Sequence, residues 1–180
     1  GEKYIAAYTI AINLWFLGAF LIDGYASAGN ILSGRLFGAK DFKTLLKLSN
    51  RLIIYGIAAG TLICLFGFLF YKPIGRIFTN DPEVLKTFGN VFWMVLLMQP
   101  LCAIAFIFDG VFKGLGWMRY LRNLLLYSTL LVFIPVLLVT DYYDLKLKGI
   151  FTAFTFWILA RGLPLVMKFR RTFTALAQKP

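Results

Sequence analysis

The feature that most constrains this chain is a stretch of 31 residues, Tyr4 to Gly34, in which Asp23 is the only charged side chain. About 20 apolar helical residues are enough to cross the roughly 30 Å hydrocarbon core of a bilayer. A carboxylate held at that depth is costly, and such acids usually face a cavity, an ion path or a partner. The stretch therefore predicts a membrane-spanning helix, and Asp23 is its first candidate functional residue.

Four further apolar stretches follow and argue against a water-soluble globule. We expect spans near residues 4–34, 50–72, 82–112, 119–140 and 149–169. The chain is 60% hydrophobic and only 15% charged, whereas soluble domains are about 25% charged. The sequence predicts an all-α polytopic membrane helix bundle with about five transmembrane helices, forming a single membrane domain over residues 1–180.

Basic residues are distributed unevenly among the segments outside the spans. Twelve Lys and Arg residues, with one acid, lie in or beside the connection between spans one and two, the connection between spans three and four, and the segment after span five, whereas the alternate connections and the span ends beside them hold five basic and four acidic residues. Cytoplasmic loops carry the excess of Lys and Arg. We therefore expect a multi-pass protein of the cell inner (plasma) membrane with a cytoplasmic C-terminus. Five spans then place the N-terminus outside, so we also expect at least one upstream helix.

Several classes of function find no support in the residues. The net charge of +11 does not indicate nucleic-acid binding, because the basic residues flank apolar runs instead of forming an aromatic-interleaved patch. The chain has no histidine, and Cys64 and Cys102 lie inside apolar runs without the spacing of metal ligands. We expect neither an enzyme, nor a metal site, nor a cofactor.

Small and polar residues recur on one face of the first span. Asp23, Ser27, Asn30 and Gly34 follow offsets of four, seven and eleven residues, which places them on one helical stripe. Such a stripe either packs closely against another helix or lines water. The cavity or substrate candidates are Tyr8, Asn13, Asn30 and Gln99, with Trp15 as an aromatic candidate that would otherwise face lipid.

The second and third spans carry features that bear on helix packing. Gly56 and Gly60 have the GxxxG spacing that permits close helix contact. In span three, Pro100 removes a backbone hydrogen bond and predicts a hinge, while Gln99 either satisfies the freed carbonyl or faces a cavity.

Two interpretations stand for Asp109, near the end of span three. It is either a transport and coupling residue, like Asp23, or an ion-paired clamp at the cytoplasmic interface with Lys113 or Arg119. Arg161, in span five, is close enough to the membrane interface for its charge to reach water, and it could also pair with Asp109 or Asp23.

Taken together, these motifs resemble the multidrug and toxic compound extrusion (MATE) family, and most closely its DinF-like branch. The segments that carry the resemblance are Asp23-Gly24 through Ser33-Gly34-Arg35-Leu36-Phe37-Gly38-Ala39-Lys40-Asp41, Phe78-Thr79-Asn80-Asp81-Pro82-Glu83-Val84, and Gln99-Pro100 followed by Asp109-Gly110-Val111-Phe112-Lys113-Gly114-Leu115-Gly116 with Arg119 and Asn123. Their order and spacing match helices eight to twelve of that family. The resemblance implies a partial C-terminal lobe of a twelve-helix protein, with the N-terminal lobe and the seventh helix missing from this chain.

The resemblance also implies a function and its partners. Family members export organic cations or amphipathic small molecules, including drugs and other xenobiotics, against an inward flow of H+ or Na+, by alternating access. The acid of sodium-coupled relatives would fall at Cys102 here, so we expect a proton-coupled antiporter rather than a sodium-coupled one. Two alternatives stay open: a lipid-precursor flippase of the same superfamily, which should carry more intramembrane basic residues than Arg161, and a non-transporting structural membrane fragment.

Overall fold

The computed structural model describes residues 2–178, which form one helical bundle. The elements in chain order are α1 (Glu2–Gly38), α2 (Phe42–Phe78), α3 (Pro82–Gly114), α4 (Met118–Ser128), the π-helical turn η1 (Thr129–Phe133), α5 (Ile134–Tyr142) and α6 (Lys146–Ala177). α4, η1 and α5 run on as one span, so the described chain holds five helices long and apolar enough to cross a membrane. The predicted all-α membrane bundle is confirmed, and each expected span lies within one of these helical segments.

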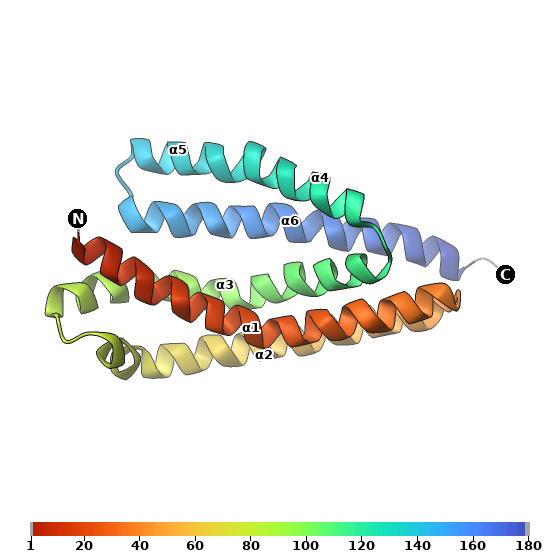
Figure 1. The fold of residues 1–180 in the computed structure, drawn as a ribbon, viewed down its shortest axis with the longest axis horizontal. Coiled ribbons are helices and arrows are strands. Elements are labelled where there is room, and N and C mark those ends of the chain that lie inside the picture. The colour runs from red at the N-terminus through yellow and green to blue at the C-terminus, as the bar shows by residue number, and fades with distance from the viewer. Residues whose placement is uncertain (1, 179–180) are drawn as a thin grey trace.

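α3 is the central helix of the bundle. It packs against α1 and α2 on one side and against α6 on the other, while α4 and α5 lie along α6 (Figure 1). Two apolar clusters fill the spaces between these helices, one around Phe88 and Met98 and the other around Phe108 and Phe112. Because α3 supplies residues to both clusters, its position fixes that of the helices around it.

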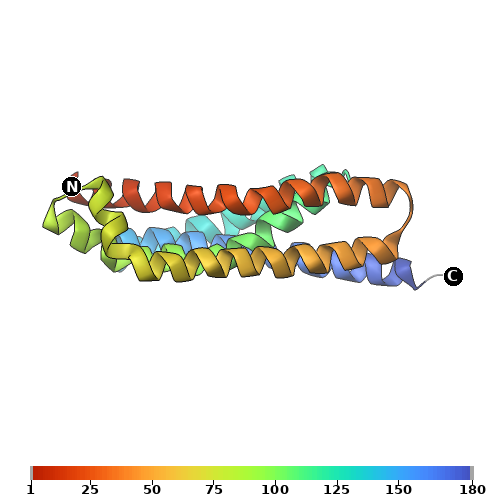
Figure 2. The same cartoon turned by 90° about the horizontal axis from the view of Figure 1, so that it is seen from below.

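The two sets of connections lie at opposite ends of the bundle. The α1–α2 turn, the α3–α4 turn and the end of α6 share one end, and the α2–α3 and α5–α6 turns share the other (Figures 1 and 2). The lysines and arginines of the predicted basic set are therefore gathered at one end, except Lys179, which lies outside the described residues. Which side of the membrane this end occupies stays a prediction.

Three of the four turns end a helix in the same way. Lys40, Gly116 and Asp144 have left-handed backbones, with φ of 57°, 74° and 51°. After α1, for example, the Asp41 N–H donates to the Leu36 carbonyl at 3.0 Å, a bond typical of a Schellman C-cap. These short turns hold consecutive spans side by side.

The α2–α3 turn instead depends on the side chain that begins α3. Asp81 Oδ1 accepts hydrogen bonds from the N–H groups of Glu83 at 2.8 Å and Val84 at 3.4 Å, and Pro82 occupies the first helical position. We expect Asp81→Ala to lower the free energy of unfolding by about 1 kcal/mol, because it leaves these N–H groups without their acceptor. Asp141→Ala, at an exposed site on the same end of the bundle, is the control. Equal unfolding curves for the two variants would contradict a capping role.

Two irregular segments lie beside prolines. In α2, Phe70 departs from helical geometry with φ −113° and ψ 15°, because Pro73 cannot donate to the Leu69 carbonyl and its ring crowds that carbonyl. In the fourth span, η1 ends at Phe133, two residues before Pro135, and its wide turn accommodates the missing N–H of the proline. α3, by contrast, runs through Pro100 as one helix, so a hinge at Pro100 stays a prediction about motion.

Candidate functional site

The rotation of α1 is set by close contact with α3. A Cβ added at Gly110 would lie 2.0 Å from the Ala26 carbonyl oxygen, and one at Gly114 would lie 2.1 Å from the Asn30 carbonyl oxygen. Ser33 Oγ, fully buried, donates to the Val111 carbonyl at 3.1 Å. The small residues of α1 therefore face α3, and the opposite side of α1 points away from the bundle.

That outward side carries most of the polar candidates of the first span. Asn13, Asp23 and Asn30 are all exposed, and their spacing of ten and seven residues keeps them within roughly 100° around the helix. Phe16 and Phe20 lie among them, and their rings stack with centroids 6.4 Å apart. We call these five residues the polar face of α1.

Asp23 is the only carboxylate on this face. It forms no ion pair with any described residue, and Phe20, one turn away, is 73% exposed. Asp23, Ser27 and Asn30 of the predicted stripe are thus exposed, whereas Gly34, its last member, packs against Gly114 of α3, where a Cβ would lie 3.0 Å from the Gly114 carbonyl oxygen. A carboxylate next to an aromatic face suits an organic cation, which the charge attracts and the ring stabilises further.

Asp109 has a different environment. It is 5% exposed, and its Oδ2 accepts a hydrogen bond from Arg161 in a salt bridge between α3 and α6. The Arg161 guanidinium also lies 5.3 Å from the centre of the Trp157 ring. Of the partners expected for Asp109, the structure shows Arg161, and neither Lys113 nor Arg119 makes this contact. Asp109 Oδ1 is buried without a hydrogen-bond partner among the described residues.

Gln99 lines a pocket of about 390 Å³ between α1, α2 and α3. The walls are almost entirely apolar, including Leu17, Leu62 and Leu96. Gln99 is 1% exposed, and its Oε1 has no hydrogen-bond partner among the described residues. Gly18 makes room for the amide, because a Cβ there would lie 2.6 Å from it. The pocket can hold an apolar group.

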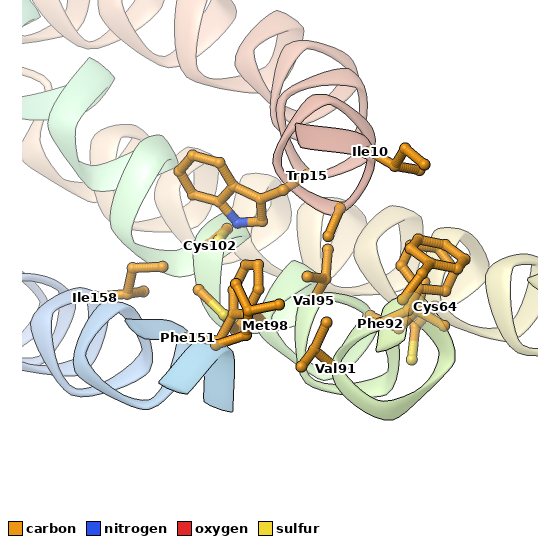
Figure 3. Packing of buried hydrophobic residues seen from close by; sticks show 14 of the residues in the cluster. Ile10, Trp15, Cys64, Val91, Phe92, Val95, Met98, Cys102, Phe151 and Ile158 are labelled. Atoms are coloured by element: carbon orange, nitrogen blue, oxygen red, sulfur yellow. The ribbon is translucent and has the colours of Figure 1, made fainter. Parts of the chain in front are cut away.

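Two aromatic candidates belong to the core instead. Tyr8 is half-buried and packs against Phe151, with ring centroids 6.1 Å apart. Trp15 is 8% exposed, and Figure 3 shows its ring directed toward Cys102, within the cluster of buried residues from α1, α2, α3 and α6. The alternative in which Trp15 faces lipid is therefore wrong, and neither ring joins the polar face of α1.

Sequence reasoning missed three contributors to these sites. Phe16 and Phe20 were interpreted only as part of an apolar run. Gly18 was not identified, because its role depends on Gln99, which lies on another helix. Helical periodicity places Phe16 and Phe20 on the side of Asp23, and that signal was available. Within residues 2–178, no group of three His, Cys, Asp or Glu side chains could hold a metal ion.

Comparison with known proteins gives consistent matches. The MatE family model matches residues 1–139. Protein DETOXIFICATION 42 of Arabidopsis thaliana is 31% identical over 114 residues, which cover 63% of this chain and 22% of that protein. Probable multidrug resistance protein NorM of Neisseria meningitidis is 28% identical over 100 residues, covering 56% of this chain and 22% of that one. The chain thus spans about a fifth of the length of the curated relatives it matches.

Solved structures share the same fold. An outward-facing conformation of a multidrug resistance MATE family transporter superposes with a TM-score of 0.88 at 19% identity, covering 99% of this chain and 40% of that one. A crystal structure of a MATE protein in complex with MaL6 gives a TM-score of 0.77 at 19% identity, with 99% and 41% covered. The five spans therefore adopt an arrangement already known from a membrane transporter.

Proposed function

Because the chain belongs to the MatE family, which consists of multidrug transporters, we propose that it forms part of a cation-coupled exporter of organic cations or amphipathic compounds. The observation that carries this proposal is the polar face of α1, where Asp23 lies without an ionic partner beside exposed aromatic rings. Intramembrane acids of this kind are typical of ion and substrate paths.

The coupling role falls to Asp23. A carboxylate can hold either a proton or a cationic substrate, but not both, so proton entry releases the substrate and substrate binding releases the proton. Alternating access, with this helical unit moving against the rest of the protein, would expose Asp23 to each side in turn. The N-terminal lobe of the family and the lipid bilayer are the partners that this motion requires.

Protons fit this site better than sodium. A proton needs one carboxylate, and Asp23 is the only one on its face, whereas hard cations such as Na+ prefer several oxygen ligands. The position expected to carry the acid of sodium-coupled relatives is Cys102, which is fully buried among apolar side chains. We therefore propose proton coupling.

Asp109 and Gln99 have supporting roles. Since Arg161 already neutralises Asp109, we assign this pair to holding α3 against α6 instead of to coupling. The pairing also occupies Arg161, the intramembrane cation on which a flippase for anionic lipid precursors would depend, and this disfavours that alternative. The pocket that Gln99 lines would hold the apolar part of an amphipathic substrate.

Asp23→Asn in the full-length protein tests the proposal. The amide cannot exchange a proton, so we expect proton-coupled efflux of an organic cation such as ethidium from proteoliposomes to fall at least about tenfold. Asp141→Asn, which removes a charge at the end of the bundle, should leave efflux unchanged. Unaltered efflux and proton movement in Asp23→Asn would remove Asp23 from the mechanism.

We further propose that the basic end of the bundle, with the C-terminus, faces the cytoplasm.

A further inference from the structure

A second cavity lies at the basic end of the bundle, between the last turns of α1 and the first turns of α2. Its volume is about 580 Å³. Two stripes form its walls, each with the i, i+3, i+4, i+7 spacing of one helical face. The residues are Leu32, Arg35, Leu36 and Ala39 from α1, and Thr44, Lys47, Leu48 and Arg51 from α2. We call this cavity the α1–α2 groove.

The groove carries positive charge that no acid of the described chain neutralises. Arg35, Lys47 and Arg51 are exposed, and none of them forms an ion pair with a described residue. The nearest acid along the chain, Asp41, caps α2 by accepting a hydrogen bond from the Thr44 N–H at 3.0 Å. Hydrogen bonding by Thr44, with a smaller contribution from Lys47, lowers the pKa of Asp41, so this acid is already engaged at the helix start.

The same groove is apolar along part of its wall. Leu32 is 38% exposed, and Leu36 and Leu48 are partly buried beside it. Ile31, next to the groove, is 63% exposed. The groove therefore combines three cations with an aliphatic wall, at the point where two spans leave the apolar part of the bundle.

We propose that the α1–α2 groove binds an anionic phospholipid, with its phosphate between Arg35, Lys47 and Arg51 and an acyl chain along Leu32 and Leu36. Basic pockets between transmembrane helices suit anionic headgroups, and the guanidinium groups can pair with phosphate oxygens in bidentate fashion. The groove is separate from the polar face of α1, so this proposal does not depend on the proposed export function.

Native mass spectrometry of the full-length protein, titrated with phosphatidylglycerol or phosphatidylcholine, tests the site. We expect one preferred phosphatidylglycerol adduct in the unmodified protein. In the triple variant Arg35→Gln, Lys47→Gln, Arg51→Gln, the affinity for that adduct should fall at least about tenfold, given the contribution of each cation near an anionic headgroup. The control variant Lys43→Gln, Lys113→Gln, Arg170→Gln removes the same charge from exposed positions at the same end, outside the groove, and should keep the adduct.

Three results would overturn the proposal. They are the lack of a phosphatidylglycerol preference in the unmodified protein, an equal loss in the control variant, and displacement of the lipid by inorganic phosphate at equal concentration, which would indicate a simple anion site. Melting temperatures in phosphatidylcholine show whether each variant is folded. If the triple variant does not fold, Arg35→Gln and Arg51→Gln singly should each weaken the adduct severalfold, and unchanged binding in both would count against the site.

Discussion

Arg161→Ala is expected to lower the free energy of unfolding by about 3–5 kcal/mol, because it leaves the Asp109 carboxylate buried without its counter-charge. Asp109 is 5% exposed and its Oδ1 has no hydrogen-bond partner, so Arg161 is the one described side chain that donates to this carboxylate. The variant also removes the contact between Arg161 and the Trp157 ring. Reversible unfolding of the full-length protein in mixed micelles measures the change.

Two matched variants separate charge from packing. Asp109→Leu combined with Arg161→Leu removes both charges and should be much less destabilising than Arg161→Ala, since apolar replacements of a buried pair are often close to neutral. Lys3→Ala breaks an exposed pair with Glu83 and should change stability by less than about 1 kcal/mol. If Arg161→Ala unfolds like the unmodified protein, the buried pair does not contribute as argued.

The same double variant bears on function. If Asp109 only holds α3 against α6, a folded protein with leucine at both positions should retain proton-coupled efflux, whereas Asp23→Asn should not. Loss of efflux in a folded double variant would return Asp109 to the coupling mechanism. Stability and transport together thus distinguish the two interpretations that the sequence left open for this acid.

The helices were predictable from sequence because hydropathy is a local property. The five apolar runs and the separation of the basic segments can be identified without knowing which helices contact one another. The partner of Asp109 is different: the sequence offered Lys113, Arg119 and Arg161, and the bundle brings Arg161 to it from 52 residues further along the chain. Spacing along one helix cannot decide which of these candidates makes the contact.

The direction in which each helical face points was harder to predict than the position of the helices along the sequence. Periodicity placed Asp23 and Asn30 on one stripe, but only the Ala26 and Gly110 contact shows that this stripe points away from α3. The Gly56 and Gly60 spacing correctly predicted close packing, since a Cβ at Gly60 would lie 2.9 Å from the Gln99 carbonyl oxygen. The wide turn η1 was not predicted, because a proline identifies a weak point in a helix without specifying how the backbone adapts.

The α1–α3 contact leads to the second large prediction. Gly110→Ala would place a Cβ 2.0 Å from the Ala26 carbonyl oxygen and 2.9 Å from the Ala26 Cα, which are backbone atoms that cannot rotate away. The helices would have to separate, and Ser33 would lose its hydrogen bond to Val111. We expect the free energy of unfolding to fall by about 3 kcal/mol, at the upper end of the effects of overpacking. Reversible unfolding in mixed micelles measures the change.

Gly24→Ala is the matched control, because a Cβ there meets no atom within 4 Å. Alanine favours a helix over glycine by about 1 kcal/mol, so this variant should be as stable as the unmodified protein or slightly more so. The expected changes in the free energy of unfolding have opposite signs at Gly24 and Gly110. Such a result would exclude a general effect of replacing glycine by alanine. Since the contact at Gly110 also sets the direction of the polar face of α1, any folded Gly110→Ala protein should show reduced efflux, while Gly24→Ala should not. Equal stability of the two variants would mean that α1 and α3 do not approach as closely as described, and Asp23 would then lose the scaffold that orients it.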